Sequence, residues 1–234
     1  MLHFYDTKTQ TTRKLKTGSL SNDIRNTHNY IKSVLIDKFV PPDSILVDLG
    51  CGQGGDLLKL KKINEYHGID VSIQAIKSAT NRAKNLNLSY DCYFLQMDMQ
   101  EDLSVYCSSR VNCILANFSF HYICTTEQNT YTALQNIYNA LRNDGIFLGC
   151  IPEHFRPSFT RVKTKHPGEN RLCEEPVIDK NDLVQIAQSV GFRNVLCLPF
   201  SDFMRKYKNK KIYKKMNICV DPIPNTVFVF VKPQ

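Results

Sequence analysis

The sequence lacks the long apolar runs and the clustered cysteines that mark several classes of protein. No apolar run approaches the roughly 20 residues of a membrane-spanning helix, and residues 1–16 hold no apolar stretch of the signal-peptide type. The nine cysteines are scattered, none forms a C-x-x-C pair, and no cysteine and histidine have zinc-binding spacing. We therefore expect an intracellular protein from a reducing compartment, with no membrane contact and no bound metal.

The sequence also lacks internal repeats and low-complexity linkers, which predicts one folded unit. Its 234 residues are 42% hydrophobic and 22% charged, which excludes a wholly disordered or collagen-like chain. The 30 Lys and Arg residues outnumber the 22 Asp and Glu residues and give a net charge of +8. This excess favours anionic partners, and nucleic acid first.

Strand and helix patterns alternate along most of the chain. Residues 1–22 are polar and basic, which predicts an irregular arm before a domain over residues 23–234, whose first helix is expected over 23–39. Apolar runs predict strands over 44–49, 66–70, 91–96, 111–117 and 146–151, with helices from about 56, over 72–87 and over 127–142. A less regular segment at about 152–179 precedes a helix over 180–190 and strands over 195–199 and 226–232. This order predicts an α/β fold, a parallel Rossmann-like sheet with helices on both faces.

Glycines follow the first predicted strand, and an acid ends the second. Gly50, Gly52 and Gly55 satisfy G-x-G-x-x-G, and Asp70 stands 20 residues after Gly50. Glycines let the backbone approach a ligand closely, and an acid at this spacing can accept hydrogen bonds from two ribose hydroxyls. In α/β sheets ligands bind outside the carboxyl ends of the strands, so these residues predict a nucleoside site.

Carboxylates around the glycine loop argue against a dinucleotide. Pyrophosphate prefers a positive helix N-terminus, whereas Asp48 precedes this loop and Asp56 begins the segment after it. The two acids suit a ligand with positive charge and no phosphate, such as S-adenosylmethionine. Asp98, after the third strand, is placed to reach the adenine amino group of such a ligand.

Longer motifs resemble one enzyme family. The loop VDLGCGQGGDLLK, the GID that ends strand two and the LQMD after strand three look like a class I S-adenosylmethionine-dependent methyltransferase. Residues 25–32 (RNTHNYIK) resemble the RN-x-NN-x-x-K helix of the mRNA cap (guanine-N7) methyltransferases. Residues 117–122 (NFSFHY) resemble their QFSFHY segment, and residues 149–152 (GCIP) resemble their GTVP segment. The resemblance covers about residues 22–232.

This resemblance implies a mostly parallel seven-stranded sheet with a small cap-binding lobe at about 152–179, and methyl transfer from S-adenosylmethionine to guanine N7 of GpppRNA. The residues expected at the methyl donor are Lys32, Asp48, Gly50, Asp70, Asp98, Asn117 and Tyr122. Those expected at the RNA cap are His28, Asn29, Lys59, Arg82, Phe118, His121, Tyr122 and Glu174, with Glu175 as the alternative to Glu174. Guanine N7 carries a lone pair and no proton, so no acid or base catalyst is expected.

The sequence departs from the family pattern at three positions. Gln53 replaces a phosphate-side Lys, Asn117 replaces a Gln, and Thr226 lies near the expected place of a cap-contacting Tyr. The short arm suggests a virus-encoded enzyme, which would act in the cytoplasm, or one domain of a larger capping protein. A cellular enzyme would act in the nucleus. Whether the enzyme is viral or cellular, it could act together with other capping domains or with a stimulatory subunit.

Two other functions stay open on the sequence alone: methylation of a different substrate, and a non-catalytic methyltransferase-like subunit of a capping complex. The run over 205–215 holds seven cations and two tyrosines. It is either a solvated helix face or a patch that contacts RNA phosphates.

Overall fold

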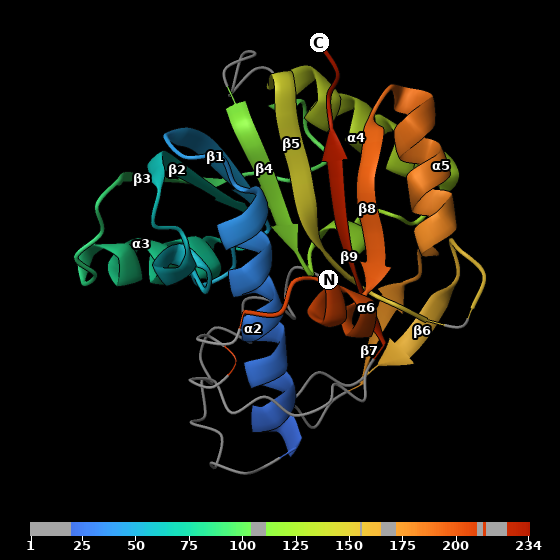
Figure 1. Ribbon diagram of the computed structural model, residues 1–234, viewed down its shortest axis with the longest axis horizontal. Coiled ribbons are helices and arrows are strands. Elements are labelled where there is room, and N and C mark those ends of the chain that lie inside the picture. The colour runs from blue at the N-terminus through green and yellow to red at the C-terminus, as the bar shows by residue number, and fades with distance from the viewer. Residues whose placement is uncertain (1–19, 104–110, 155, 165–171, 210–212, 214–223) are drawn as a thin grey trace.

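The computed structural model describes residues 20–103, 111–154, 156–164, 172–209, 213 and 224–234. A single twisted sheet runs through its centre, and helices pack on both of its faces (Figure 1). No helix of the described residues is both long and apolar enough to span a bilayer.

The central sheet has seven strands in the order β3-β2-β1-β4-β5-β9-β8. Strands β1 to β5 pair in parallel, and β9 is antiparallel to both of its neighbours. The bounds are β1 Ser44–Leu49, β2 Ile63–Asp70, β3 Asp91–Gln96, β4 Val111–Asn117, β5 Leu141–Pro152, β8 Arg193–Pro199 and β9 Asn225–Val231. The predicted mostly parallel, seven-stranded sheet is confirmed. Because strand order reverses at β1 and β4, the crevice at their carboxyl ends is the expected ligand site.

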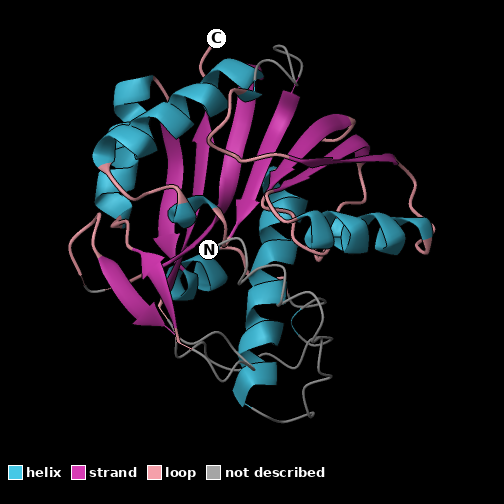
Figure 2. Cartoon of the chain, turned by 180° about the vertical axis from the view of Figure 1, so that it is seen from behind, coloured by secondary structure: helices cyan, strands magenta, loops and turns pink. Residues whose placement is uncertain are grey.

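Helices cover the two faces of the sheet because its strands are apolar on both sides. On β9, Val227 and Val229 join the core beneath one set of helices, while Phe228 and Phe230 join the opposite core. The first set is α2 (Leu20–Phe39), α3 (Ile73–Lys84) and α6 (Phe200–Lys206), and the second is α4 (Glu127–Ala140) and α5 (Lys180–Val190). Figure 2 shows the sheet between these layers from behind.

Local signals explain where the helices begin and end. Ser72 and Thr126 accept hydrogen bonds from the backbone N–H groups of Ala75 and Asn129, which fixes the starts of α3 and α4. Helix α5 ends at Gly191, whose φ of 114° is a conformation that glycine adopts without strain. These helix N-caps place the helix starts next to the strand ends that precede them.

Several predicted elements differ in the structure. The helix expected from Asp56 is only a 3-10 turn, η1 (Leu57–Lys59), because β2 begins at Ile63 and leaves no room for a longer helix. Helix α6 was not predicted. The segment expected to be irregular contains a two-stranded antiparallel sheet, β6 (Arg161–Thr164) with β7 (Cys173–Pro176). Helix α2 begins at Leu20, inside the predicted arm, and residues 1–19 lie outside the described part of the chain.

Candidate functional site

The glycine loop after β1 turns tightly against the segment that follows β4. Gly50, Gly52 and Gly54 have φ values of 72°, 54° and 70°, so Gly54 rather than Gly55 completes the left-handed turn. A Cβ atom on Gly50 would lie 2.4 Å from the Cβ atom of Ser119. The Ser119 hydroxyl in turn donates to the carbonyl of Leu49 over 2.5 Å. The loop and the residues after β4 therefore form one packed unit.

Asp70 closes the glycine loop from the end of β2. Its Oδ2 atom accepts a hydrogen bond from the Gly52 N–H over 2.8 Å, and its Oδ1 atom accepts one from the Ser72 N–H over 2.9 Å. The carboxylate thus holds the loop next to the start of α3. A carboxylate oxygen can accept more than one hydrogen bond, so Asp70 retains capacity for a ligand hydroxyl.

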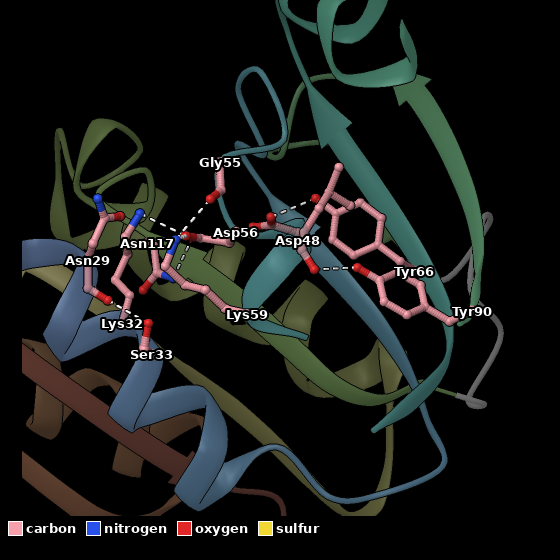
Figure 3. Close-up of polar contacts among 11 residues, drawn as sticks. Asn29, Lys32, Ser33, Asp48, Gly55, Asp56, Lys59, Tyr66, Tyr90 and Asn117 are labelled. Carbon is pink, nitrogen blue, oxygen red and sulfur yellow. Dashed lines mark hydrogen bonds and ion pairs between the residues drawn. The ribbon is translucent and has the colours of Figure 1, made fainter. Parts of the chain in front are cut away.

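Asp48 lies buried on β1 beneath the loop. The Tyr66 hydroxyl donates to its Oδ2 atom over 2.8 Å (Figure 3). Burial, followed by repulsion from Asp56, raises the pKa of Asp48 to about 7. Because burial disfavours the ionised carboxylate, a ligand with positive charge nearby would stabilise it. Tyr66 was not among the residues predicted from the sequence.

A buried ion network centred on Asp56 joins α2, η1 and β4. The Asp56 Oδ1 atom lies 2.8 Å from the Nζ atoms of both Lys32 and Lys59, and its Oδ2 atom accepts a hydrogen bond from Asn117 over 2.9 Å (Figure 3). Lys59 also donates to the carbonyl of Gly55. Burial alone would raise the pKa of Asp56, but the two ammonium groups outweigh it and hold that pKa well below its usual range.

The Asn117 amide marks the open side of this network. Its Oδ1 atom is buried and accepts no hydrogen bond from any described residue. Asn29 lies on α2, one turn before Lys32, and its backbone carbonyl accepts a hydrogen bond from Ser33 (Figure 3). An unsatisfied buried acceptor at the end of β4 calls for a donor from outside the chain.

Asp98 and Arg82 lie at the edge of the site. Asp98 follows β3, is partly exposed, and accepts a hydrogen bond from the N–H of Gln100. Arg82 is exposed on α3, yet its charge lies near enough to contribute to lowering the pKa of Lys59, where burial is the larger cause. The Lys59 ammonium itself pairs with Asp56 at 2.8 Å.

A second polar cluster forms where the turn η3 (Phe120–Tyr122) meets strand β7 of the lobe. Glu175 is 3% exposed and His121 is 2% exposed. The Tyr122 hydroxyl donates to the Glu175 Oε1 atom over 2.5 Å, and His121 Nε2 lies 3.9 Å from Oε2. Of the two acids that the sequence offers for guanine, Glu175 is the one buried beside His121, whereas Glu174 is exposed.

An aromatic group adjoins the two polar clusters. The His28 ring stacks on Phe118 with centroids 4.7 Å apart and meets Phe200 edge-on at 5.8 Å. The Nε2 atom of His28 lies 3.2 Å from Nδ2 of Asn225 on β9. Phe118 has a φ of 59°, which is strained for a non-glycine residue and is typical of functional sites. Neither Phe200 nor Asn225 carried a recognisable sequence signal.

Three other features considered from the sequence are Thr226, metal-binding groups and the basic run over 205–215. Thr226 is buried, and its hydroxyl donates to Glu153 over 3.1 Å. This hydrogen bond holds the residue that follows β5 in place. Within the described residues, no group of His, Cys, Asp and Glu side chains could hold a metal ion. In the run over 205–215, residues 210–212, 214 and 215 lie outside the described part of the chain, and Asn209 donates its N–H to the Tyr30 hydroxyl, which ties this run to α2.

The fold resembles those of solved methyltransferase structures. The chain superposes on a magnesium protoporphyrin IX methyltransferase from Synechocystis with bound SAM, with a TM-score of 0.66, 12% identity, and coverage of 99% of this chain and 94% of that one. An S-adenosylmethionine-dependent methyltransferase from Clostridium acetobutylicum gives a TM-score of 0.62 at 12% identity, covering 99% and 97%. At these identities the likeness establishes the Rossmann-like methyltransferase fold.

Sequence comparisons establish the family. The chain is 34% identical over 157 residues to the mRNA cap guanine-N(7) methyltransferase of Saccharomyces cerevisiae, covering 62% of this chain and 35% of the yeast protein. It is 31% identical over 168 residues to mRNA cap guanine-N(7) methyltransferase 1 of Arabidopsis thaliana, covering 64% and 44%. The chain thus spans about a third of the length of the yeast relative. The profile of the mRNA (guanine-N(7))-methyltransferase domain matches residues 1–175. By this match, the chain belongs to the mRNA (guanine-N7)-methyltransferase family.

Proposed function

We propose that this chain transfers the methyl group of S-adenosylmethionine to N7 of the guanine cap of RNA, converting GpppRNA to m7GpppRNA. The observation that carries the proposal is the pairing of two clusters at one sheet edge. The glycine loop with its acids lies on one side, and buried Glu175 with His121 and Tyr122 lies on the other. Ser119 packs between Gly50 and the His121 turn and joins the two clusters.

The first cluster fits S-adenosylmethionine. Cβ atoms on Gly52 and Gly55 would meet only open space, so the loop leaves room for a ligand. Asp70 would bind the ribose hydroxyls, and the unsatisfied Oδ1 of Asn117 would accept from the ammonium group. Asp48 favours a nearby positive charge. Bound here, S-adenosylmethionine supplies an electrophilic methyl group on its sulfonium.

The second cluster suits guanine. The Glu175 carboxylate would accept hydrogen bonds from guanine N1–H and the exocyclic amine, and His121 would donate to O6. N7 is already nucleophilic, so the chain needs to hold the base in line rather than remove a proton. Orientation of this kind contributes on the order of 7–11 kcal/mol in well-aligned reactions. The ring becomes cationic when N7 is methylated, and a nearby carboxylate stabilises that charge.

The cap triphosphate requires cations near the same edge. We assign Arg82 and Lys59 to it, as the resemblance implies; Arg82 is exposed, and Lys59 is held by Asp56. His28, Asn29 and Phe118 are assigned to the guanosine side of the cap. The aromatic stack of His28 on Phe118 offers a flat apolar surface there.

Label transfer from S-adenosylmethionine tests the proposed reaction. GpppRNA should accept the label, while ApppRNA and m7GpppRNA should not, because the first lacks the guanine donors and the second is already methylated at N7. Labelling of all three would point to a methyltransferase with another substrate. Tight binding of S-adenosylmethionine without transfer would point to a non-catalytic subunit.

The biological setting follows from the relatives. The two reported above are a fungal and a plant protein, which gives no support to a viral origin. We propose that the enzyme acts within the cell on nuclear transcripts. Capped RNA is its proposed partner, and other capping domains or a stimulatory subunit remain proposals based on the family alone.

Asp70→Ala should weaken S-adenosylmethionine binding by about 100-fold or more, because two charge-assisted ribose hydrogen bonds are lost. It should also lower the free energy of unfolding by about 1–3 kcal/mol, because the N–H groups of Gly52 and Ser72 lose their acceptor. Calorimetric titration and urea unfolding measure the two effects. Asp91→Ala, at the exposed start of β3, is the control. Unchanged cofactor affinity in Asp70→Ala would remove the ribose assignment.

S-adenosylmethionine affinity should rise with pH between about 6 and 8. Burial and then Asp56 raise the pKa of Asp48 to about 7 in the free protein, and a sulfonium nearby favours the ionised carboxylate. Binding therefore releases a proton, and affinity increases as pH rises through the free-protein pKa. S-adenosylhomocysteine has no sulfonium charge, so its affinity should change less. Equal pH slopes for both ligands, or an unchanged slope in Asp48→Asn, would contradict this linkage.

A further inference from the structure

We propose that His154 is a second histidine of the base-recognition cluster and reads the exocyclic amine of the cap guanine. This inference rests on the proposed function. His154 has no counterpart among the motifs that identify the family, and no sequence signal pointed to it.

The position of His154 is set by the end of β5. Strand β5 ends at Pro152, and Glu153 is then anchored on three sides. Its N–H donates to the carbonyl of Pro224, and its carboxylate binds Lys180 at 2.7 Å and the hydroxyl of Thr226 at 3.1 Å. His154 therefore follows a fixed residue at the carboxyl end of the sheet, where the two clusters lie.

The His154 ring carries an unsatisfied polar atom. Its Nε2 atom is buried and makes no hydrogen bond with any residue in the described part of the chain. Such an atom is costly to leave without a partner, and it is typical of a site that a ligand completes. The charge of Glu175, the acid already assigned to guanine, acts on this ring and raises its pKa, although burial is the larger cause and lowers it.

A neutral His154 ring can accept the hydrogen of the guanine amine that Glu175 does not bind. Burial lowers the pKa of His154 more than the Glu175 charge raises it, so the ring is neutral at pH 7 and one nitrogen is an acceptor. Guanine has an exocyclic amine with two hydrogens. Glu175 takes N1–H and one amine hydrogen, and the second amine hydrogen needs a separate acceptor. In the tautomer that is protonated on Nδ1, the buried Nε2 atom of His154 can be that acceptor.

A cap analogue without the amine gives the test. Hypoxanthine keeps N7, O6 and N1–H but has no exocyclic amine, so IpppRNA can be compared with GpppRNA. We expect the wild type to prefer GpppRNA in kcat/KM. His154→Phe should lower kcat/KM for GpppRNA by about tenfold and leave that for IpppRNA nearly unchanged. His154→Gln, whose amide oxygen can accept, should recover part of the preference.

Controls separate this role from a structural one. His67→Phe removes a histidine on β2 that stacks on Tyr93, away from the lobe, and should keep the wild-type preference. S-adenosylmethionine affinity should be unchanged in every variant. An equal loss on both caps in His154→Phe and His154→Gln, or a wild type with no preference for guanine over hypoxanthine, would overturn the proposal while methyl transfer still stands. If the wild type methylates neither cap, the proposed function itself fails.

Discussion

Replacement of Glu175 by Gln should lower methyl transfer to GpppRNA by at least about tenfold, with S-adenosylmethionine binding intact. The carboxylate is 3% exposed, and Tyr122 holds one of its oxygens in place. Gln keeps the size of the side chain but loses the charge and one acceptor, and a hydrogen bond to a charged group contributes about 1.5–3 kcal/mol. Because the ring becomes cationic as N7 is methylated, the loss should fall on kcat as well as on KM. Steady-state kinetics on GpppRNA measures both.

The neighbouring acid supplies the matched control. Glu174 is exposed on the same short strand, so Glu174→Gln removes the same charge without touching the cluster. It should behave like the wild type. Loss of activity in Glu174→Gln together with an active Glu175→Gln would reverse the assignment. Two fully active variants would mean that the lobe does not read the base.

Asp56→Asn should be the most destabilising single change in the site, lowering the free energy of unfolding by about 3–5 kcal/mol. Asp56 is the shared partner of two ammonium groups, and the side chains of Asp56, Lys32 and Lys59 are 7%, 16% and 12% exposed. The amide removes the carboxylate that both ammonium groups contact, and it leaves two buried cations close to each other. Urea unfolding at pH 7 measures the loss. Asp202→Asn, which breaks an exposed pair with Arg205, should cost less than about 1 kcal/mol.

The stability that the Asp56 network contributes should depend on pH. The lysines hold the pKa of Asp56 below that of the unfolded chain, so its contribution is full above about pH 4 and is lost as pH falls further. The deficit of Asp56→Asn relative to the wild type should therefore shrink below about pH 4. A deficit that stays constant down to acid pH would mean that the ion pairs do not carry the stability.

Much of the fold could be predicted because the strands are short apolar runs and their ends carry polar residues. Asp48, Asp70 and Asn117 end adjacent strands, so their convergence follows from a parallel sheet alone. The short turn at Asp56 could not be predicted in the same way. Its sequence, D-L-L-K, is typical of a helix start, but β2 begins at Ile63 and leaves room for only one turn.

The choice between Glu174 and Glu175 shows a second limit. Adjacent residues of a strand point to opposite faces, so which acid turns inward depends on the register of the strand. Here Glu174 pairs with Lys163 and Glu175 with Val162 on β6. That register is a tertiary property of two four-residue strands, and no periodic pattern of so few residues can fix it. His154 and Phe200 escaped prediction because their partners are distant in sequence.

The position of β9 in the sheet determines the order in which the strands can assemble during translation. Among the strands that the structure describes, β8 pairs only with β9, which is also the outer partner of β5 and is synthesised after both. During translation the five parallel strands can assemble as they emerge, while β8 must wait for a strand that the ribosome releases later. Until then the edge of β5 is unpaired, and the nascent chain exposes an open β-edge next to the half-built site. Completion of the sheet is therefore a late, non-local step, and a chaperone that shields the β5 edge would act in that interval.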